Sequence, residues 1–117
     1  KDNKMSSSIP LNTFKTSTFN VTTVDTTVYT TPAGVTTVVL LAQVANINAS
    51  SQVTISATHL RSGNVTSIIK NTIIPINDAA SLLTGKLILQ TGDSFTISAS
   101  ANSSGQLLLS YLETANA

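Results

Sequence analysis

Residues 29–46 constrain the fold of this chain more than any other segment. A short β-prone stretch ends in a Pro-Ala-Gly turn at residues 32–34, and the long stretch that follows is continuously apolar at residues 38–41. Successive side chains of a strand point to opposite sides, so this run is apolar on both faces. A strand of that kind must be covered on both sides. We therefore expect it in the middle of a packed β domain or against a neighbouring subunit.

Strand-like segments recur at a spacing of about ten residues from Phe14 onward, separated by Gly, Pro, Asn and Ser turns. Alternation is clearest at residues 52–58 and 94–101, where apolar and hydroxyl side chains take turns. We expect strands at residues 13–19, 22–29, 36–46, 52–60, 65–74, 86–90, 94–101 and 106–113. The pattern predicts an all-β fold, a single antiparallel β-sandwich of about eight strands that is either jelly-roll-like or Ig-like.

The rest of the chain is assigned as follows. Residues 77–83 form either a short helical turn, capped by Asn77 or Asp78, or a connecting loop whose leucines enter the core. Residues 1–12 are polar, and we expect an extended N-terminal arm that is flexible or ordered by a partner. Residues 13–117 are the sandwich domain, since a chain of 117 residues supports a single core.

Composition favours a protein that works within an assembly. Charged residues make up only 9% of the chain, against about 25% in average soluble domains. Ser and Thr together account for 35 of the 117 residues, so hydroxyl groups supply most of the polarity. A weakly charged surface rich in β-formers is prone to edge association in a free monomer. A net charge of +1 without a Lys/Arg cluster argues against a nucleic-acid partner. No run approaches the roughly 18 apolar residues of a membrane span, so no membrane partner is expected either.

The residues that could carry chemistry are few. His59 is the only histidine, and no Asp or Glu lies close to it in the sequence. The remaining carboxylates of the predicted domain are dispersed, at Asp25, Asp78, Asp93 and Glu113. Catalysis needs a positioned pair of groups, and a metal site needs at least three ligands. We therefore interpret His59 as a strand-end residue at a sheet edge or subunit contact. The sequence predicts no catalytic, cofactor-binding or metal-binding residues, and no enzyme.

Five other side chains have two interpretations each. Asp93 is either a ligand-binding acid or, as we favour, a turn residue that accepts backbone N–H groups at a hairpin corner. Arg61 and Lys70 either bind an acidic partner or protect a solvated edge strand, which is the simpler interpretation. Tyr29, together with Tyr111, could stack on sugars, but aromatic residues are only 4% of the chain and Trp is absent.

Several segments, taken in order, resemble a small β-sandwich found in many virion proteins of tailed phages. They are residues 28–34, 38–46, 69–76, 82–93 and 109–113, the last two reading L-L-T-G-K-L-I-L-Q-T-G-D and L-S-Y-L-E. The resemblance implies a homo-oligomeric head-decoration, head-fibre, neck or tail accessory protein in the virion, in contact with major capsid or tail/neck proteins. The family motif carries no catalytic residues. The chain departs from it at residues 77–81, where relatives have Pro-Ala-Gly or Pro-Ala-Asp.

From these observations we expect a structural virion component that forms a homo-oligomer, with a trimer as the expected size. The arm and the long apolar strand should make the assembly contacts. We expect the strand's apolar side chains to be divided between the core and a neighbour, namely Val38, Val39, Leu40, Leu41 and Val44. The alternative is a glycan- or host-surface-binding adhesin domain that uses Tyr29, His59 and loop Asn and Thr side chains.

Overall fold

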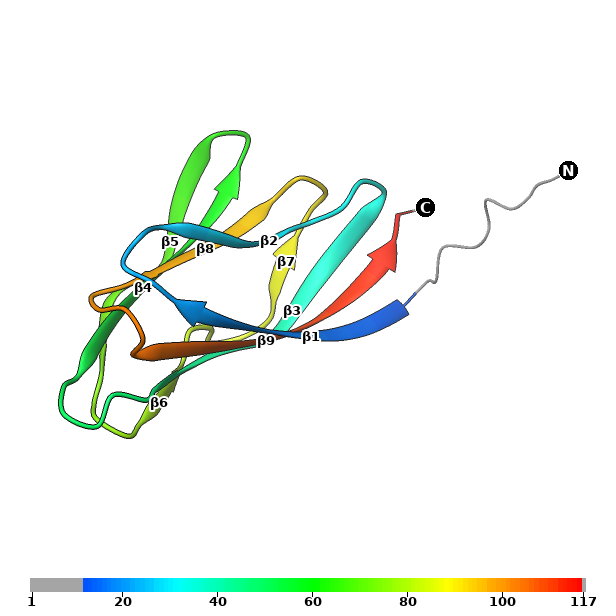
Figure 1. Ribbon diagram of the computed structural model, residues 1–117. Coiled ribbons are helices and arrows are strands. Elements are labelled where there is room, and N and C mark those ends of the chain that lie inside the picture. The colour runs from blue at the N-terminus through cyan, green and yellow to red at the C-terminus, as the bar shows by residue number, and fades with distance from the viewer. Residues whose placement is uncertain (1–11, 117) are drawn as a thin grey trace, which may run out of the picture.

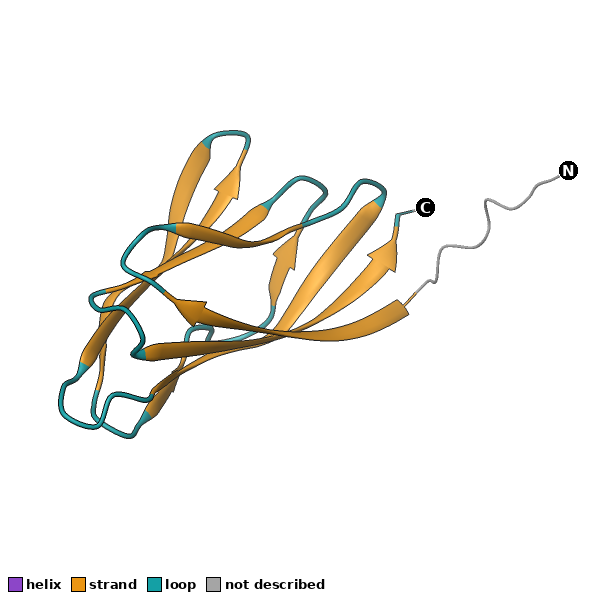
Figure 2. Ribbon diagram, in the orientation of Figure 1, coloured by secondary structure: helices purple, strands orange, loops and turns teal. Residues whose placement is uncertain are grey.

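The computed structural model describes residues 12–116, which form two antiparallel sheets packed as a sandwich (Figures 1 and 2). Sheet A contains β1 (Asn12–Val21), β9 (Gly105–Ala115), β3 (Val35–Asn46), β6 (Ala79–Ser81) and β7 (Leu87–Leu89). Sheet B contains β2 (Thr26–Thr30), β8 (Ser94–Ala99), β4 (Val53–Arg61) and β5 (Asn64–Ile74). The expected all-β sandwich is confirmed.

The strand pairing is that of a jelly roll. β4 pairs with β5, β3 with β6 and β7, β2 with β8, and β1 with β9. These nested pairs describe one long hairpin with its tip at the β4–β5 turn, rolled so that alternate pairs lie in opposite sheets (Figure 1). Of the two sandwich types expected from the sequence, the structure therefore adopts the jelly roll.

Every strand expected from the sequence is present, with ends that shift by up to four residues. The helical turn considered at residues 77–83 is wrong, because Ala79–Ser81 form β6 and pair with Gln43–Ala45 of β3. β3 extends beyond β7, and β6 supplies the hydrogen-bonding partner for that part of its edge. The Asp78 carboxylate accepts the Ala79 N–H at 2.8 Å, which holds the chain at the start of β6. The expected arm lies outside the described residues except for Asn12, which belongs to β1.

Two turns carry the chain between the sheets, and one of them is the turn at Asp93 that we expected at a hairpin corner. Residues 31–34 connect β2 of sheet B to β3 of sheet A, and residues 90–93 connect β7 of sheet A to β8 of sheet B. Turn chemistry predicts where the chain reverses but not which sheet the next strand joins. The turns bind each other, because Thr31 N–H donates to Asp93 O at 2.9 Å and Gly92 N–H donates to Thr31 O at 3.0 Å.

The core lies between the sheets and explains the two-sided strand. A register shift between Val39 and Leu41 marks a bulge in β3 against β9. Val39 and Val44 are fully buried in the core, while Leu40 is 39% exposed on the outer face of sheet A. In β9, Leu107 and Leu109 face the core, and Leu108 and Leu112 face outward, because successive side chains of a strand alternate. The apolar residues of β3 are thus divided between the core and the outer face of sheet A.

Candidate functional site

Asp93 is the buried centre of a charged cluster in the β7–β8 turn. Its side chain is 3% exposed, and its Oδ2 atom lies 3.0 Å from His59 Nε2 and 2.6 Å from Arg61 Nη2. Arg61 Nε also donates to the carboxylate, at 2.9 Å from Oδ1, and the Gln90 N–H donates to Oδ2 at 2.9 Å. Hydrogen bonds from Arg61, then from His59 and the Gln90 N–H, hold the pKa of Asp93 well below its usual range despite burial.

This cluster corrects three interpretations. Arg61 is not an isolated edge cation, since it pairs with Asp93, whereas Lys70 is exposed on the edge strand β5 as expected. His59 is at the end of a strand, but β4 lies between β8 and β5 and is not a sheet edge. Asp93 does accept a backbone N–H, although at a turn between sheets and not at a hairpin corner. His59 and Arg61 both bind the Asp93 carboxylate, which suits a structural lock.

A second, partly buried cluster joins the sheets around Tyr29 of β2. The Tyr29 hydroxyl donates to Glu113 Oε2 at 2.6 Å and lies 2.7 Å from Thr37 Oγ1, and its ring centroid is 4.6 Å from that of Tyr111. Lys15 Nζ lies 2.8 Å from Glu113 Oε1. Burial, and then the bond to Glu113, raise the pKa of Tyr29 above its usual range. Burial opposes ionisation of Glu113, but hydrogen bonds from Lys15 and Tyr29 lower its pKa overall.

These contacts bear on the glycan-binding alternative. The Tyr29 hydroxyl and His59 Nε2 are bonded inside the domain, and the Tyr111 side chain is buried. These two polar atoms are therefore already used and do not supply hydrogen bonds to a sugar. Among residues 12–116, no group of three or more His, Cys, Asp or Glu side chains is placed to hold a metal ion. The surface is therefore the place to look for function.

The outer face of sheet A carries an apolar row that crosses four strands. Phe14 of β1 pairs with Leu112 of β9, Leu112 with Val38 of β3, and Val38 with Ile88 of β7. Directly opposed residues in neighbouring strands lie on the same face, so these four side chains form one line, which we call the apolar row. Phe14 is 71% exposed and Ile88 is 48% exposed. The β3 bulge adds Leu40 beside the row.

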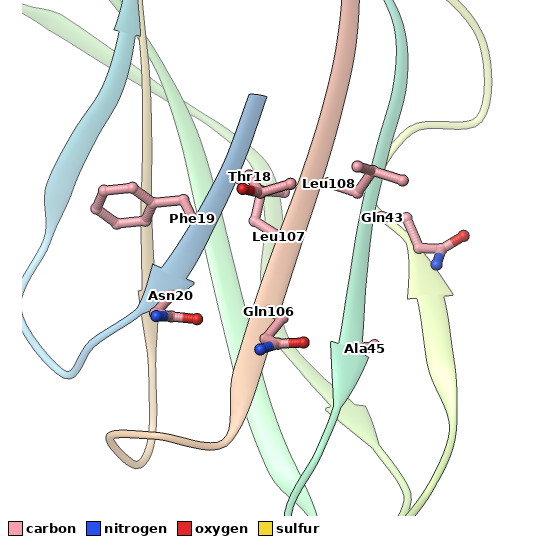
Figure 3. Close-up of a pocket in the computed structure, with 8 residues that line it drawn as sticks. All are labelled: Thr18, Phe19, Asn20, Gln43, Ala45, Gln106, Leu107 and Leu108. Carbon is pink, nitrogen blue, oxygen red and sulfur yellow. The ribbon is translucent and has the colours of Figure 1, made fainter. Parts of the chain in front are cut away.

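Further along the same face lies a hollow of about 400 Å³ (Figure 3). It is lined by Thr18, Phe19, Asn20, Gln43, Ala45, Gln106, Leu107 and Leu108. Three of these residues, Asn20, Gln43 and Gln106, carry uncharged amides, so the polar end of this face has hydrogen-bonding capacity but no charge.

The outer face of sheet B is different in kind. The outward residues of its central strands β4 and β8 are almost all hydroxyl-bearing, namely Thr54, Ser56, Thr58, Ser94, Thr96 and Ser98, with Leu60 as the exception. Some of these hydroxyls bond across strands, as Thr58 does to Thr96 and Thr30 to Ser94. Such a face is well suited to water. The domain thus has one outer face whose central strands carry hydroxyls, beside exposed Val65 and Ile73 of β5, and another outer face that the apolar row crosses.

Sequence reasoning identified part of this surface. It selected Val38, Val39, Leu40, Leu41 and Val44 as divided between the core and a neighbour without assigning each residue to one side. The structure places Val38, Leu40 and Leu41 on the outer face of sheet A. Sequence reasoning missed Phe14 and Ile88, because the apolar row is created by pairing between strands far apart in the chain. The only local signal was the alternation in 12–20, which puts Phe14 among polar residues.

Comparisons with known proteins give a likeness in fold but no family. No family model matches the chain, and no curated protein matches it. Among solved structures, the chain is similar to one from Bacillus endospore appendages, described as a novel family of disulfide-linked pili. The TM-score is 0.53 with 11% identity, over 91% of this chain and 88% of that chain. No helix in residues 12–116 is long and apolar enough to cross a membrane. The comparison thus supports the all-β sandwich architecture.

Proposed function

We propose that this chain is a structural subunit that assembles with copies of itself. The observation that carries the proposal is the contrast between the two outer faces, one with hydroxyls on its central strands and the other crossed by the apolar row. Contiguous exposed apolar surface on a soluble domain marks an interaction site. Burying a Leu, Ile or Phe side chain is worth roughly 1.5–3 kcal/mol, so leaving the row in water is costly.

The assembly we propose is the particle of a tailed phage. The support is the ordered resemblance of residues 28–34, 38–46, 69–76, 82–93 and 109–113 to small virion accessory proteins. The structural neighbour belongs to pili, which are also built from repeated subunits and so agree with a subunit role. Its disulfide linkage has no counterpart here, because this chain contains no cysteine. Within the virion the subunit decorates the head or forms part of a head fibre, neck or tail, in contact with capsid or tail proteins.

Mass spectrometry of purified phage particles tests this assignment. Particles from a host that carries the gene should contain peptides of this chain in a fixed ratio to the major capsid or tail protein. Removing the gene should then change particle composition without removing an enzymatic activity. Particles that lack the chain while it accumulates elsewhere would contradict the virion assignment.

The amide-lined hollow keeps a second candidate, a glycan- or host-surface-binding domain. Asn and Gln side chains both donate and accept hydrogen bonds, which suits sugar hydroxyls. The binding groups would then be Asn20, Gln43 and Gln106 in place of Tyr29 and His59. A glycan array decides between the functions. Specific binding that is lost in Gln106→Ala would favour the adhesin, and an array without specific binding would favour the structural subunit.

A further inference from the structure

We propose that the outer face of sheet A packs against the same face of a second copy, around a two-fold axis. This inference rests on the proposed function, because it names the partner and the surface through which the subunit assembles. The apolar row lies at the centre of the contact, with Leu112 and Val38 as its two middle residues. The amide-lined hollow lies toward the edge of the contact.

The absence of charge makes this face compatible with itself. The residues that the strands direct to it are Asn12, Phe14, Thr16, Thr18 and Asn20 of β1, Gln106, Leu108, Ser110, Leu112 and Thr114 of β9, Thr36, Val38, Leu40, Leu41, Gln43 and Ala45 of β3, Ala79 and Ser81 of β6, and Ile88 of β7. None of them carries a charge. Two charged residues do lie within these strands, Lys15 of β1 and Glu113 of β9, but both alternate onto the opposite side of sheet A and pair with each other at 2.8 Å. Lys86 lies immediately before β7. A two-fold contact brings identical patches together, so like charges would oppose it.

The apolar row suits a two-fold contact for a geometric reason. An axis in the plane of the interface that runs along the row places row against row. Leu112 then faces Leu112 of the second copy, and Ile88 faces Ile88. Sheets that pack face to face bring apolar side chains together across a spacing of about 10 Å. The contact therefore resembles the domain's own core.

The outer face of sheet A is large enough for a stable dimer interface. β1 and β9 run side by side over the ten residues of β1, Asn12–Val21. With about 3.3 Å per residue and about 4.8 Å between strands, four strands project an area on the order of 500 Å². Side-chain relief raises the accessible area above this projection, toward the roughly 800 Å² per partner of a standard interface.

The difference between the two outer faces also favours a contact between two apolar rows over a head-to-tail contact. A head-to-tail contact would place the apolar row on the hydroxyls of sheet B, such as Thr54 and Ser98, and would bury them without partners. A contact between two apolar rows also covers hydroxyls beside the row, but Thr16 already bonds to Ser110 and Thr36 to Asn116. The amides of Asn20, Gln43 and Gln106 supply a polar rim. The self-contact makes a dimer the basic unit, in place of the trimer expected from the sequence.

A charge-swap experiment tests the contact. Leu112→Lys and Leu112→Glu are each prepared in the full chain, with circular dichroism and thermal melting to check the fold. Ile88→Lys and Ile88→Glu, at a 48% exposed position, provide a second pair if the first pair folds poorly. Masses are measured by sedimentation equilibrium. Wild type should show twice the 12.1 kDa chain mass, and each charged variant alone should show the single-chain mass.

Mixing then reports the symmetry. An equimolar mixture of the Lys and Glu variants should restore the doubled mass, because opposite charges meet across a two-fold contact. Folded variants that still dimerise alone would overturn the self-contact while leaving a self-assembling subunit in place. Variants that are monomeric alone and in the mixture would overturn the two-fold symmetry. A wild type that is monomeric at every concentration would instead overturn the proposed function.

Discussion

Two guanidinium nitrogens of Arg61 donate hydrogen bonds to the carboxylate of Asp93, although the two residues are separated by 32 positions in the sequence. Nη2 lies 2.6 Å from Oδ2, and Nε lies 2.9 Å from Oδ1. Since Asp93 also receives the Thr31 N–H on its backbone carbonyl, the pair links the end of β4 to both turns that cross between the sheets. The cluster thus fixes one end of the jelly roll.

Asp93→Asn should weaken the domain. The substitution keeps the size of the side chain but removes the charge that Arg61 and His59 bind in a site that is 3% exposed. We expect the free energy of unfolding to fall by about 1–3 kcal/mol in urea denaturation, because a hydrogen-bonded buried charge is lost. Asp25→Asn, in the exposed β1–β2 loop, is the matched control and should change it by less than about 0.5 kcal/mol. Equal effects of the two substitutions would show that the cluster is not a structural lock.

The domain should lose stability in acid. The folded-state pKa values of Asp93 and Glu113 are both lowered, so their contributions are present above the usual carboxyl pKa of about 4. As the pH falls further, the unfolded chain takes up protons before the folded domain does, and stability decreases. Denaturation between pH 7 and pH 2 should show this loss below about pH 4, and it should be smaller in Asp93→Asn. A pH-independent stability in that range would contradict the ion-pair assignment.

Gly105→Ala should be destabilising because the start of β9 lies against the core. A Cβ atom at Gly105 would approach Val44 Cγ1 to 3.2 Å and Ile55 Cδ1 to 3.3 Å. Both neighbours are fully buried, so the expected cost of overpacking is about 1–3 kcal/mol in chemical denaturation. At Gly85 an added Cβ meets nothing within 4 Å, so Gly85→Ala should be neutral or stabilising by up to about 1 kcal/mol. If Gly105→Ala proves as mild as the control, the packing between the sheets is looser there.

Two neighbouring leucines test the orientation of β9. Leu109 is 1% exposed in the core, and Leu108 is directed to the outer face of sheet A. Leu109→Ala should reduce the free energy of unfolding by about 2–5 kcal/mol, whereas Leu108→Ala should cost clearly less in the monomer. Thermal melting at low protein concentration separates this effect from association. A reversed order of the two effects would mean that β9 has the opposite face inward.

The sequence was sufficient to predict where most strands lie, but not to predict the Asp93 cluster or the apolar row. Val53, Ile55 and Ala57 alternate with polar residues, and because the period of a strand is two, their direction toward the core followed directly. β6 was missed because a three-residue strand has no period of its own, although Leu82 enters the core as the loop interpretation of residues 77–83 expected. β6 exists because the edge of β3 offers it partners.

The contacts that define the site depend on which sheet each strand joins. His59 and Asp93 are brought together because β4 pairs with β8. Phe14 joins the apolar row because β9 lies between β1 and β3. Turn chemistry at residues 31–34 and 90–93 does not contain that information. Pairing of distant strands is a property of the whole core, so the sequence pattern alone could not supply it.

Sedimentation equilibrium of three proteins tests the central claim most directly. Wild type should show a mass of twice the 12.1 kDa chain that decreases on dilution. Ile88→Thr, in the apolar row, should weaken association by about tenfold or more, since each buried Ile is worth roughly 1.5–3 kcal/mol. Ile73→Thr removes an isoleucine of similar exposure, 56% against 48%, from the outer face of sheet B and should associate as wild type does. A single-chain mass for wild type at all concentrations, or equal weakening by both substitutions, would contradict assembly through the outer face of sheet A.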